Sequence, residues 1–250
     1  QDTDLNVELT QGVGGGTSNI QPAMESGEFD IYPEYTGTAW NMVLMESGVY
    51  DESMFGELTA RYETDYGMSW LGMYGFNNTY GLVVRTEIAE QYGLETYSDL
   101  AAVDDQLTFG AEYDFFERED GYDALCETYG LDFGATMDMD IGLKYQALNQ
   151  GEIDVMVIFT TDGQLSTADA VVLADDKGFF PSYLCGNVVR NEVLSEHPEL
   201  EEIFAKLTGT ITDADMAAMN YAVETEGAEP RDVAMDFLRD HGLLNEEADA

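Results

Sequence analysis

Segments with the two-residue periodicity of β-strands alternate along most of this chain with segments that have the 3.6-residue periodicity of helices. Residues 29–32 predict a strand before a helical run at 39–45, and residues 107–113 predict a strand before a helix at 121–129. Residues 153–159 form an apolar run, broken only by Asp154, that is typical of a buried strand. Alternating strands and helices require crossover connections, so the pattern predicts an α/β fold with mostly parallel sheets flanked by helices.

The stretch Asp-Ile-Tyr-Pro-Glu-Tyr-Thr-Gly-Thr, residues 30–38, joins one of these strands to its helix. Pro33 cannot donate a hydrogen bond to a neighbouring strand, so the strand is expected to end there. Thr36 and Thr38 are candidate N-caps for the helix. Tyrosines at such a junction lie where α/β sheets bind small ligands, next to the N–H groups of a helix N-terminus. In the simpler alternative the tyrosines only fill the end of the strand.

The chain is strongly acidic, with 51 Asp and Glu against nine Lys and Arg and a formal net charge of −42. This balance argues against nucleic acid or an anionic membrane surface as a partner. It is compatible with a cationic ligand, and equally with a surface adapted to a salty or acidic medium. No apolar run approaches the roughly 20 residues of a membrane-spanning helix.

The residues that usually hold metals or perform catalysis are sparse. His197 and His241 are the two histidines, and Cys126 and Cys185 the two cysteines, so no zinc set is expected. The cysteines either form one disulfide or remain free thiols. Residues 138–140, Asp-Met-Asp, are too short for a calcium loop and are interpreted as the cap of the next helix. No catalytic arrangement of Ser, His, Asp or Cys is recognisable, and no metal or cofactor is expected.

One glycine-rich segment leaves an enzymatic alternative open. A predicted strand at 5–10 is followed by Gly12, Gly14 and Gly16 and by a short helix that ends near Ser26. This order resembles a dinucleotide-binding loop, which would make the chain a nucleotide-dependent oxidoreductase. The third glycine of that loop would fall at position 17, which is Thr17, so the match is incomplete. A tight turn whose helix N-terminus holds a ligand anion is the other interpretation.

Four aromatic residues stand at predicted ends of strands or at the loops beside them: Tyr35, Tyr80, Phe159 and Tyr183. One such residue is usually a packing residue. Four together could line a cavity, and aromatic faces bind a desolvated quaternary ammonium group by cation–π attraction. Arg118 lies among acids in Glu-Arg-Glu-Asp, where it either forms exposed ion pairs or binds a ligand carboxylate through two hydrogen bonds.

The sequence resembles the osmoprotectant-binding proteins of ABC importers, which bind glycine betaine, carnitine or choline. The segments that carry this resemblance occur in order from about Val7 to Leu244: GEFDIYPEYTGTAW, GFNNTYGLVV, FGAEYDFFERED, DIGLKYQAL, TTDGQL, DDKGFFPSY and VVRNEVLSEHPEL. The resemblance implies a two-lobed α/β clamshell of the type II periplasmic-binding-protein class. By this resemblance residues 1–78 and 187–250 form lobe I, and residues 79–186 form lobe II.

The resemblance also implies a set of ligand-binding residues. Members of the family enclose a trimethylammonium group in an aromatic cage between the lobes, and Tyr35, Tyr80, Phe159 and Tyr183 match the cage positions. Phe159 departs from the tyrosine of many relatives, so it would keep the aromatic face and lose the hydroxyl. Thr38 and Arg118 match positions that hold the polar end of the ligand, and Asn78 would contribute through its main chain.

The family's first strand and helix of lobe I have no counterpart here, because the similarity begins at the second strand. The expected function is non-enzymatic capture of a quaternary ammonium osmoprotectant and its delivery to the membrane permease of an ABC importer. The domain is expected outside the cytoplasm as a cell-surface lipoprotein, a periplasmic protein or a domain fused to a permease. A betaine of histidine is a further candidate ligand, and no nucleic acid partner is expected.

The acidic composition predicts that salt stabilises the fold. Repulsion among the carboxylates is only weakly screened in about 0.01 M salt, where the Debye length is roughly 30 Å, and strongly screened in about 1 M salt. The melting temperature measured by circular dichroism should therefore rise between these two conditions. An unchanged melting temperature would show that the excess charge does not destabilise the folded state.

Overall fold

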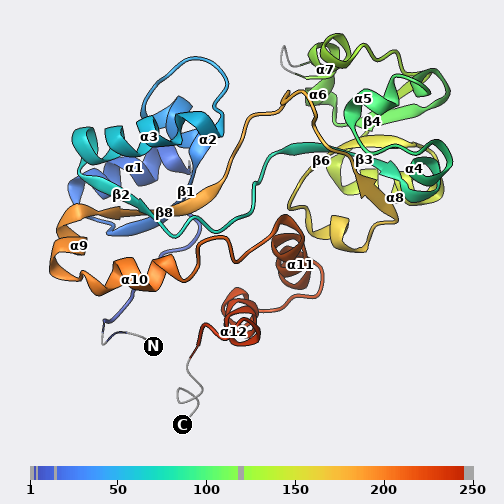
Figure 1. Cartoon of the computed structure of the whole chain (residues 1–250). Coiled ribbons are helices and arrows are strands. Elements are labelled where there is room, and N and C mark those ends of the chain that lie inside the picture. Colours follow the sequence, from blue (N-terminus) through green and yellow to red (C-terminus); the bar gives the residue numbers. More distant parts are fainter. Residues whose placement is uncertain (1–2, 4, 14–15, 118–120, 245–250) are drawn as a thin grey trace. The chain divides into compact units, whose positions relative to one another are not determined.

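The computed structural model describes residues 3, 5–13, 16–117 and 121–244. The chain forms two units, which we call unit 1 (Gln1–Asn78 and Ser182–Ala250) and unit 2 (Thr79–Pro181). Each unit contains one β-sheet with helices around it (Figure 1). The sequence placed the return to the first lobe at residue 187. The structure places it at Ser182, because β8 (Cys185–Arg190) already belongs to the sheet of unit 1.

The sheet of unit 1 has three strands in the order β1-β8-β2, where β1 spans Ile31–Tyr35 and β2 spans Met68–Leu71. Both pairings are antiparallel, so the prediction of mostly parallel sheets is wrong for this unit. The strands are antiparallel because the first residue of β8, Cys185, pairs with the last residue of β1, Tyr35. The returning chain thus enters the sheet at the end where β1 leaves it.

Successive residues of β8 face opposite sides of this sheet. Val188 packs with Tyr32 and Met68 in a cluster that includes the helices before β2, and Val189 packs with Leu194 and Leu200 on the other side. The helical segments before β2 are α1 (Thr17–Ser26), α2 (Thr36–Thr38), η1 (Ala39–Val43), η2 (Glu52–Met54), α3 (Phe55–Arg61) and η3 (Tyr62–Tyr66). Those after β8 are α9 (Asn191–Glu196), α10 (Glu199–Ala205), α11 (Asp213–Glu224) and α12 (Pro230–Asp240).

Pro33 does not end its strand, contrary to the prediction. The hydrogen bonds at the two ends of the β1–β8 ladder are Arg190 N–H to Asp30 O (3.1 Å) and Thr36 N–H to Leu184 O (3.0 Å). Bonded pairs alternate in an antiparallel ladder, so Pro33, paired with Asn187, falls in a non-bonded pair. Because β1 is also an edge strand, the missing N–H of Pro33 costs the sheet no hydrogen bond.

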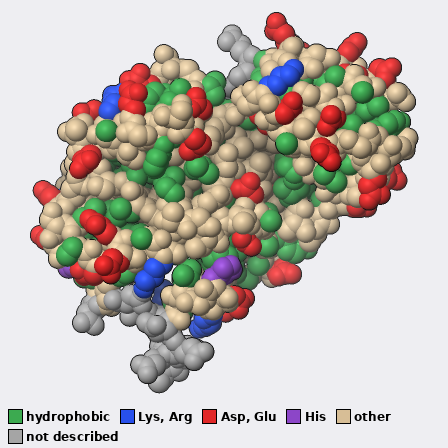
Figure 2. All heavy atoms as spheres, viewed as in Figure 1, with side chains coloured by type: hydrophobic (Ala, Val, Ile, Leu, Met, Phe, Trp, Pro, Cys, Tyr) green, Lys and Arg blue, Asp and Glu red, His purple; other side chains and the backbone are tan. Residues whose placement is uncertain are grey.

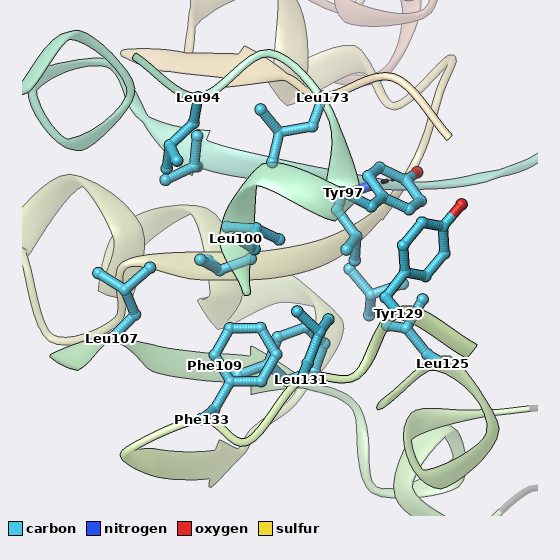
Figure 3. Packing of buried hydrophobic residues seen from close by; sticks show 14 of the residues in the cluster. Leu94, Tyr97, Leu100, Leu107, Phe109, Leu125, Tyr129, Leu131, Phe133 and Leu173 are labelled. Carbon is cyan, nitrogen blue, oxygen red and sulfur yellow. Dashed lines mark hydrogen bonds between the residues drawn. The ribbon is translucent and has the colours of Figure 1, made fainter. Parts of the chain in front are cut away.

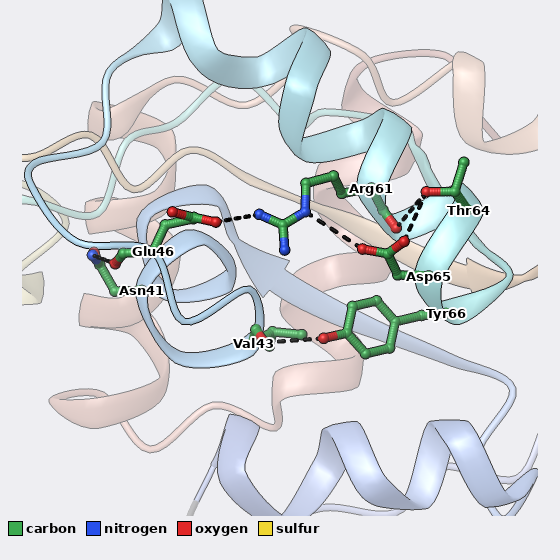
Figure 4. A network of polar contacts seen from close by, with 7 residues as sticks. All are labelled: Asn41, Val43, Glu46, Arg61, Thr64, Asp65 and Tyr66. Carbon is green, nitrogen blue, oxygen red and sulfur yellow. Dashed lines mark hydrogen bonds and ion pairs between the residues drawn. The ribbon is translucent and has the colours of Figure 1, made fainter.

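The helix expected after Thr38 is present, but its start differs from the prediction. α2 begins at Thr36 and continues as the π-helical segment η1, and neither Thr36 nor Thr38 caps it through a side chain. The loop that follows is held by polar contacts (Figure 4). Asn41 Nδ2 donates to the carbonyls of Glu46 and Gly48, both at 3.0 Å, and Arg61 forms an ion pair with Glu46.

The sheet of unit 2 has five strands in the order β5-β4-β6-β3-β7. They span Tyr80–Arg85 (β3), Thr108–Ala111 (β4), Ala135–Asp138 (β5), Val155–Phe159 (β6) and Ala170–Val172 (β7). β4 runs parallel to β5 and β6, whereas β3 runs antiparallel to β6 and β7. The prediction of mostly parallel sheets therefore holds for only half of this sheet. β5 was not predicted, and all four of its residues are exposed, which explains why its apolar periodicity is weak.

The helices of unit 2 cover both faces of its sheet. Leu82, Val84 and Phe109 face a cluster with Leu100, Leu125 and other buried side chains (Figure 3), whereas Val83 and Met156 face Tyr145 and Leu148. The helical segments are α4 (Thr86–Tyr92), α5 (Tyr97–Leu100), η4 (Asp104–Gln106), α6 (Tyr113–Glu117), α7 (Tyr122–Tyr129), α8 (Ile141–Gln150) and η5 (Gly163–Thr167). α5 begins with a capping box, in which the Thr96 side chain accepts from Asp99 N–H.

The predicted first strand, residues 5–10, is wrong. These residues form no strand, and the side chains of Val7 and Leu9 are 81% and 76% exposed. Alternating apolar residues form a strand only where another strand pairs with them, and residues 5–10 have no ladder partner among the described residues. Acidic side chains are scattered over the face of the molecule shown in Figure 2 rather than gathered in one block.

The core of unit 2 yields a stability prediction. Leu100 is fully buried in the cluster of Figure 3, so Leu100→Ala leaves a cavity and should lower the free energy of unfolding by about 2–5 kcal/mol. Leu143→Ala is the matched control, because Leu143 lies on α8 in the same unit and is 53% exposed. Urea unfolding monitored by fluorescence measures both. Equal losses in the two variants would contradict the packing described here.

Candidate functional site

In unit 1, three of the predicted site residues lie together where β1 ends and β8 begins. Tyr35 is paired with Cys185 in the last position of the ladder. Asn78 N–H donates to the carbonyl of Tyr183 at 3.2 Å, and Tyr183 N–H donates to Asn77 Oδ1 at 2.6 Å. Main-chain pairing therefore brings Tyr35, Asn78 and Tyr183, which are distant in sequence, to one end of the sheet.

The ring of Tyr183 lies against Gly37 in the first turn of α2. A Cβ on Gly37 would come within 2.6 Å of the Ser182 carbonyl oxygen and within 2.8 Å of Tyr183 Cε1. Only a residue without a side chain permits this approach. Thr38, the residue after Gly37, ends α2 and is half-buried.

Burial raises the pKa of two tyrosines in unit 1. Desolvation, together with the nearby Cys185 thiol, raises the pKa of Tyr35 to about 12, although a hydrogen bond with the Asn78 side chain acts in the opposite direction. The pKa of Tyr74 is also raised to about 12, chiefly by desolvation. Tyr35 is therefore neutral near pH 7 and presents an uncharged ring.

In unit 2, Tyr80 and Phe159 form a pair of aromatic rings at adjoining strand ends. They face each other in the β3–β6 register, and their ring centroids are 4.7 Å apart with an interplanar angle of 34°. Phe115 and Phe180 surround Tyr80, with ring centroids 6.0 Å and 5.6 Å from its own. Both members of the central pair are half-buried, so aromatic surface remains accessible within this unit.

A buried polar network fixes the strand end that carries Phe159. Phe159 N–H donates to Asp162 Oδ2 at 3.2 Å, and Tyr145 OH donates to the same oxygen at 3.0 Å. Desolvation raises the pKa of the Asp162 carboxyl, and these hydrogen bonds partly oppose the shift. Lys144, 1% exposed, donates to the carbonyl of Val157 at 2.7 Å and forms an ion pair with Glu112.

The structure thus places the described candidates in two sets, Tyr35, Thr38, Asn78 and Tyr183 in unit 1 and Tyr80 and Phe159 in unit 2. Arg118 lies outside the described residues. Sequence reasoning missed Phe115 and Phe180, although both occur in aromatic pairs, Phe-Phe, within the segments that carry the family resemblance. It also missed Asp162 and Lys144, whose polarity in otherwise buried segments was a usable signal.

Nothing in the described residues supports the nucleotide-binding alternative. Residues 5–11, which precede Gly12, form no strand, and Gly14 lies outside the described residues. The first residue of α1, Thr17, donates its hydroxyl to the carboxylate of Glu34 at 2.8 Å, so the N-terminus of that helix already faces an acid of the protein itself. No group of three or more His, Cys, Asp or Glu side chains suited to a metal ion occurs among the described residues.

The two cysteines are free thiols in different units, Cys126 in α7 and Cys185 in β8. Burial raises the pKa of Cys126 to about 11 and that of Cys185 to about 12. Both are therefore protonated at neutral pH, which makes them poor nucleophiles.

Comparison with known proteins decides the family. The OpuAC family, described as the substrate-binding domain of the ABC-type glycine betaine transport system, matches residues 1–240. The chain belongs to this family. No described helix of this OpuAC-family chain is both long enough and apolar enough to cross a membrane.

Curated relatives of this OpuAC-family chain come from several bacteria. An ergothioneine transport permease/ergothioneine binding protein of Helicobacter pylori is 44% identical over 239 residues, which are 96% of this chain and 43% of that protein. The chain thus spans less than half of the Helicobacter protein. A carnitine transport binding protein of Listeria monocytogenes is 37% identical over 95% of this chain and 78% of its own length.

Solved structures support the same fold. A crystal structure described as a glycine betaine/carnitine/choline ABC transporter matches with a TM-score of 0.87 and 36% identity, over 92% of this chain and 86% of that one. The two-lobed periplasmic-binding-protein class expected from the resemblance is confirmed by this match, and the chain is a substrate-binding component of the transport family.

The close approach at Gly37 gives a test of the unit 1 cluster. Gly37→Ala should displace the Tyr183 ring and the Ser182 carbonyl, and so lower both the melting temperature and the affinity for whatever ligand Tyr183 contacts. Gly56→Ala is the matched control: Gly56 lies in α3 of the same unit with open space around a Cβ, and alanine favours a helix by roughly 0.5–1 kcal/mol. Differential scanning fluorimetry should show opposite shifts in melting temperature.

Proposed function

We propose that this domain captures a quaternary ammonium solute outside the cytoplasm and passes it unchanged to an ABC permease. The supporting observation is the position of its aromatic residues, which stand half-buried at strand ends in a member of a substrate-binding family. Tyr80 and Phe159 in unit 2, and Tyr35 and Tyr183 in unit 1, are the proposed walls of an aromatic cage.

The physical basis is cation–π attraction. A trimethylammonium group is large and weakly hydrated, so its dehydration free energy is smaller than that of a small inorganic ion. It can therefore leave water and contact aromatic faces where a small ion stays hydrated. The ring pair of Tyr80 and Phe159, 4.7 Å apart, presents such faces without an ionised group. Glycine betaine, carnitine and ergothioneine, the solutes in the names of relatives, share this trimethylammonium group.

The polar end of the ligand requires other contacts. We propose that Thr38 and the main chain of Asn78 contribute in unit 1. Arg118 is the proposed partner of a ligand carboxylate, on the strength of the family resemblance and the geometry with which a guanidinium binds carboxylates. The ligand is not chemically altered in this proposal, because binding and release alone serve import. A permease subunit, separate or fused to the domain, is the proposed partner.

Titration calorimetry with glycine betaine, carnitine, choline and ergothioneine tests this function. Tyr80→Ala and Tyr183→Ala should each weaken binding of every ligand roughly tenfold or more, since one desolvated cation–π contact contributes about 2 kcal/mol. Tyr113→Ala is the control in unit 2, because Tyr113 is 62% exposed. Phe159→Tyr should be tolerated. Unchanged affinity in both cage variants would remove these tyrosines from the site.

The same titrations assign Arg118. Arg118→Ala should weaken glycine betaine strongly and choline little, because choline has no carboxylate. Equal losses for the two ligands would exclude a carboxylate contact at Arg118, and a failure of all four compounds to bind the wild-type protein would refute the ligand class.

A further inference from the structure

A buried acid stands directly before the proposed cage residue of β1. Glu34 is 1% exposed, and its two carboxyl oxygens lie within hydrogen-bond distance of three groups. Tyr35 N–H donates to Oε1 at 2.7 Å, and the hydroxyls of Thr17 and Tyr32 lie 2.8 Å and 3.0 Å from Oε2. The proposed function assigns no role to this group.

No cationic side chain of the described residues is paired with Glu34. Its carboxylate has no ion pair or hydrogen bond with a Lys, Arg or His among the described residues. The ionisable groups that face it are Tyr32 and Tyr35 of β1, Tyr62 of η3 and Cys185 of β8, all neutral near pH 7. Glu25 of α1 lies one hydrogen bond further away, through Gln21. Burial accordingly raises the pKa of the Glu34 carboxyl.

The hydrogen-bond geometry gives an independent proton count. The Tyr32 hydroxyl lies 3.0 Å from Glu34 Oε2 and 3.1 Å from Gln21 Oε1, but it has one proton for these two oxygens. Gln21 Nε2 donates to Glu25 Oε1 at 3.1 Å, which fixes the orientation of the amide. If Glu34 were ionised, Tyr32 would donate its hydroxyl proton to Glu34. No proton would then lie between the Tyr32 oxygen and Gln21 Oε1, and the two acceptors would repel each other. If Glu34 is protonated, it donates to Tyr32, Tyr32 donates to Gln21, and every contact has a proton.

We propose that Glu34 is a positioning residue that favours cationic ligands: it is protonated in the free protein and releases its proton when a cation binds beside Tyr35. In the step, the Glu34 proton leaves to solvent and the Tyr32 hydroxyl turns from Gln21 Oε1 to Glu34 Oε2. The carboxylate that results lies next to the Tyr35 main chain, where it attracts the bound cation. This inference rests on the proposed function, because it takes Tyr35 as a wall of the cage.

Linkage fixes the sign of the pH dependence. A bound cation favours the ionised form, so the pKa of Glu34 is lower in the complex than in the free protein, and binding releases protons. Affinity therefore rises with pH between these two pKa values and is level above the higher one. Two unit charges on the order of 10 Å apart at an effective dielectric constant of about 20 attract strongly enough to change a binding constant roughly tenfold.

Calorimetry of the wild-type protein with choline and with glycine betaine, from about pH 5 to about pH 9, measures this coupling. Neither probe titrates in this range. Titrations in two buffers of different ionisation enthalpy report the protons released. We expect proton release and an affinity that rises roughly tenfold with pH. Glu34→Gln should abolish both, because glutamine mimics the neutral acid: its oxygen can accept from Tyr35 N–H and its amide nitrogen can donate to Tyr32. Glu28→Gln, which removes an exposed charge from unit 1, should leave both unchanged.

Other outcomes separate the two proposals. Tight binding by the wild type with no proton release, or the same pH profile in Glu34→Gln, would overturn the role of Glu34 and leave the proposed function intact. No binding of either probe by the wild type would overturn the linked release along with the ligand class. The proton on Glu34 is then still tested by infrared spectroscopy of the free protein, in which the carboxyl band of a neutral acid should be lost in Glu34→Gln and kept in Glu28→Gln.

Discussion

The antiparallel pairing of β8 with β1 determines where the candidate residues of unit 1 lie. The ladder ends at Tyr35 and Cys185, and the next hydrogen bond, from Thr36 N–H to Leu184 O, continues it into the first turn of α2. Leu184 is at the same time bridged to Asn77. One short stretch of chain before β8 therefore contacts both the end of β1 and the segment that leads into unit 2. Hydrogen bonds to the main chain therefore place the backbone of Tyr35 and Tyr183 at one end of the sheet, and the side chains of Glu34 and Asn77 accept two of these bonds.

Unit 2 places its aromatic pair by the same principle and reinforces it with buried polar groups. Tyr80 and Phe159 are opposite residues of a ladder, and Asp162 ties the end of β6 by accepting from Phe159 N–H and Tyr145 OH. A buried lysine, Lys144, bonds the carbonyl of Val157 in the same strand. Polar groups in a low-dielectric interior are strongly unfavourable unless each has a partner, so such networks tolerate only a narrow range of geometries. These bonds fix the backbone at the end of β6 that carries Phe159.

Helix positions could be predicted from the sequence, whereas the pairing of the strands could not. The helices predicted at residues 39–45 and 121–129 are present close to those positions, because apolar periodicity depends on neighbouring residues alone. Strand direction depends on a partner far along the chain, so the antiparallel pairing of β1 with β8 had no local signature. The same limit explains residues 5–10, whose apolar alternation has no paired strand. The strand was predicted to end at Pro33 because proline has no N–H group. Only the register shows that an N–H at this position would face away from β8, so its absence costs no hydrogen bond.

Some candidate residues could likewise be predicted from their neighbours in the sequence, whereas others depend on residues that are distant in it. Tyr35, Tyr80, Phe159 and Tyr183 could be selected because each is an aromatic at a predicted strand end or adjoining loop, and the structure confirms strand ends for Tyr35, Tyr80 and Phe159. Glycine is required at position 37 because the Ser182 carbonyl and the Tyr183 ring lie against it. Both residues are distant in the sequence, so no local pattern predicts this requirement. Glu34 was invisible as a buried acid, because an isolated glutamate between two tyrosines is normally expected to point into solvent.

The acidic surface and the proposed aromatic site would act on a cationic ligand over different distances. The charge of −42 attracts every cation alike, and in about 1 M salt its field is screened within roughly 3 Å. Contact with a ring is a short-range interaction that requires the cation to lose its water, which favours a trimethylammonium group over sodium or potassium. In the proposed function, selectivity among cations therefore comes from the neutral aromatic faces and from groups buried beside them. Charge on the surface can speed the encounter at low salt, but it cannot distinguish one cation from another.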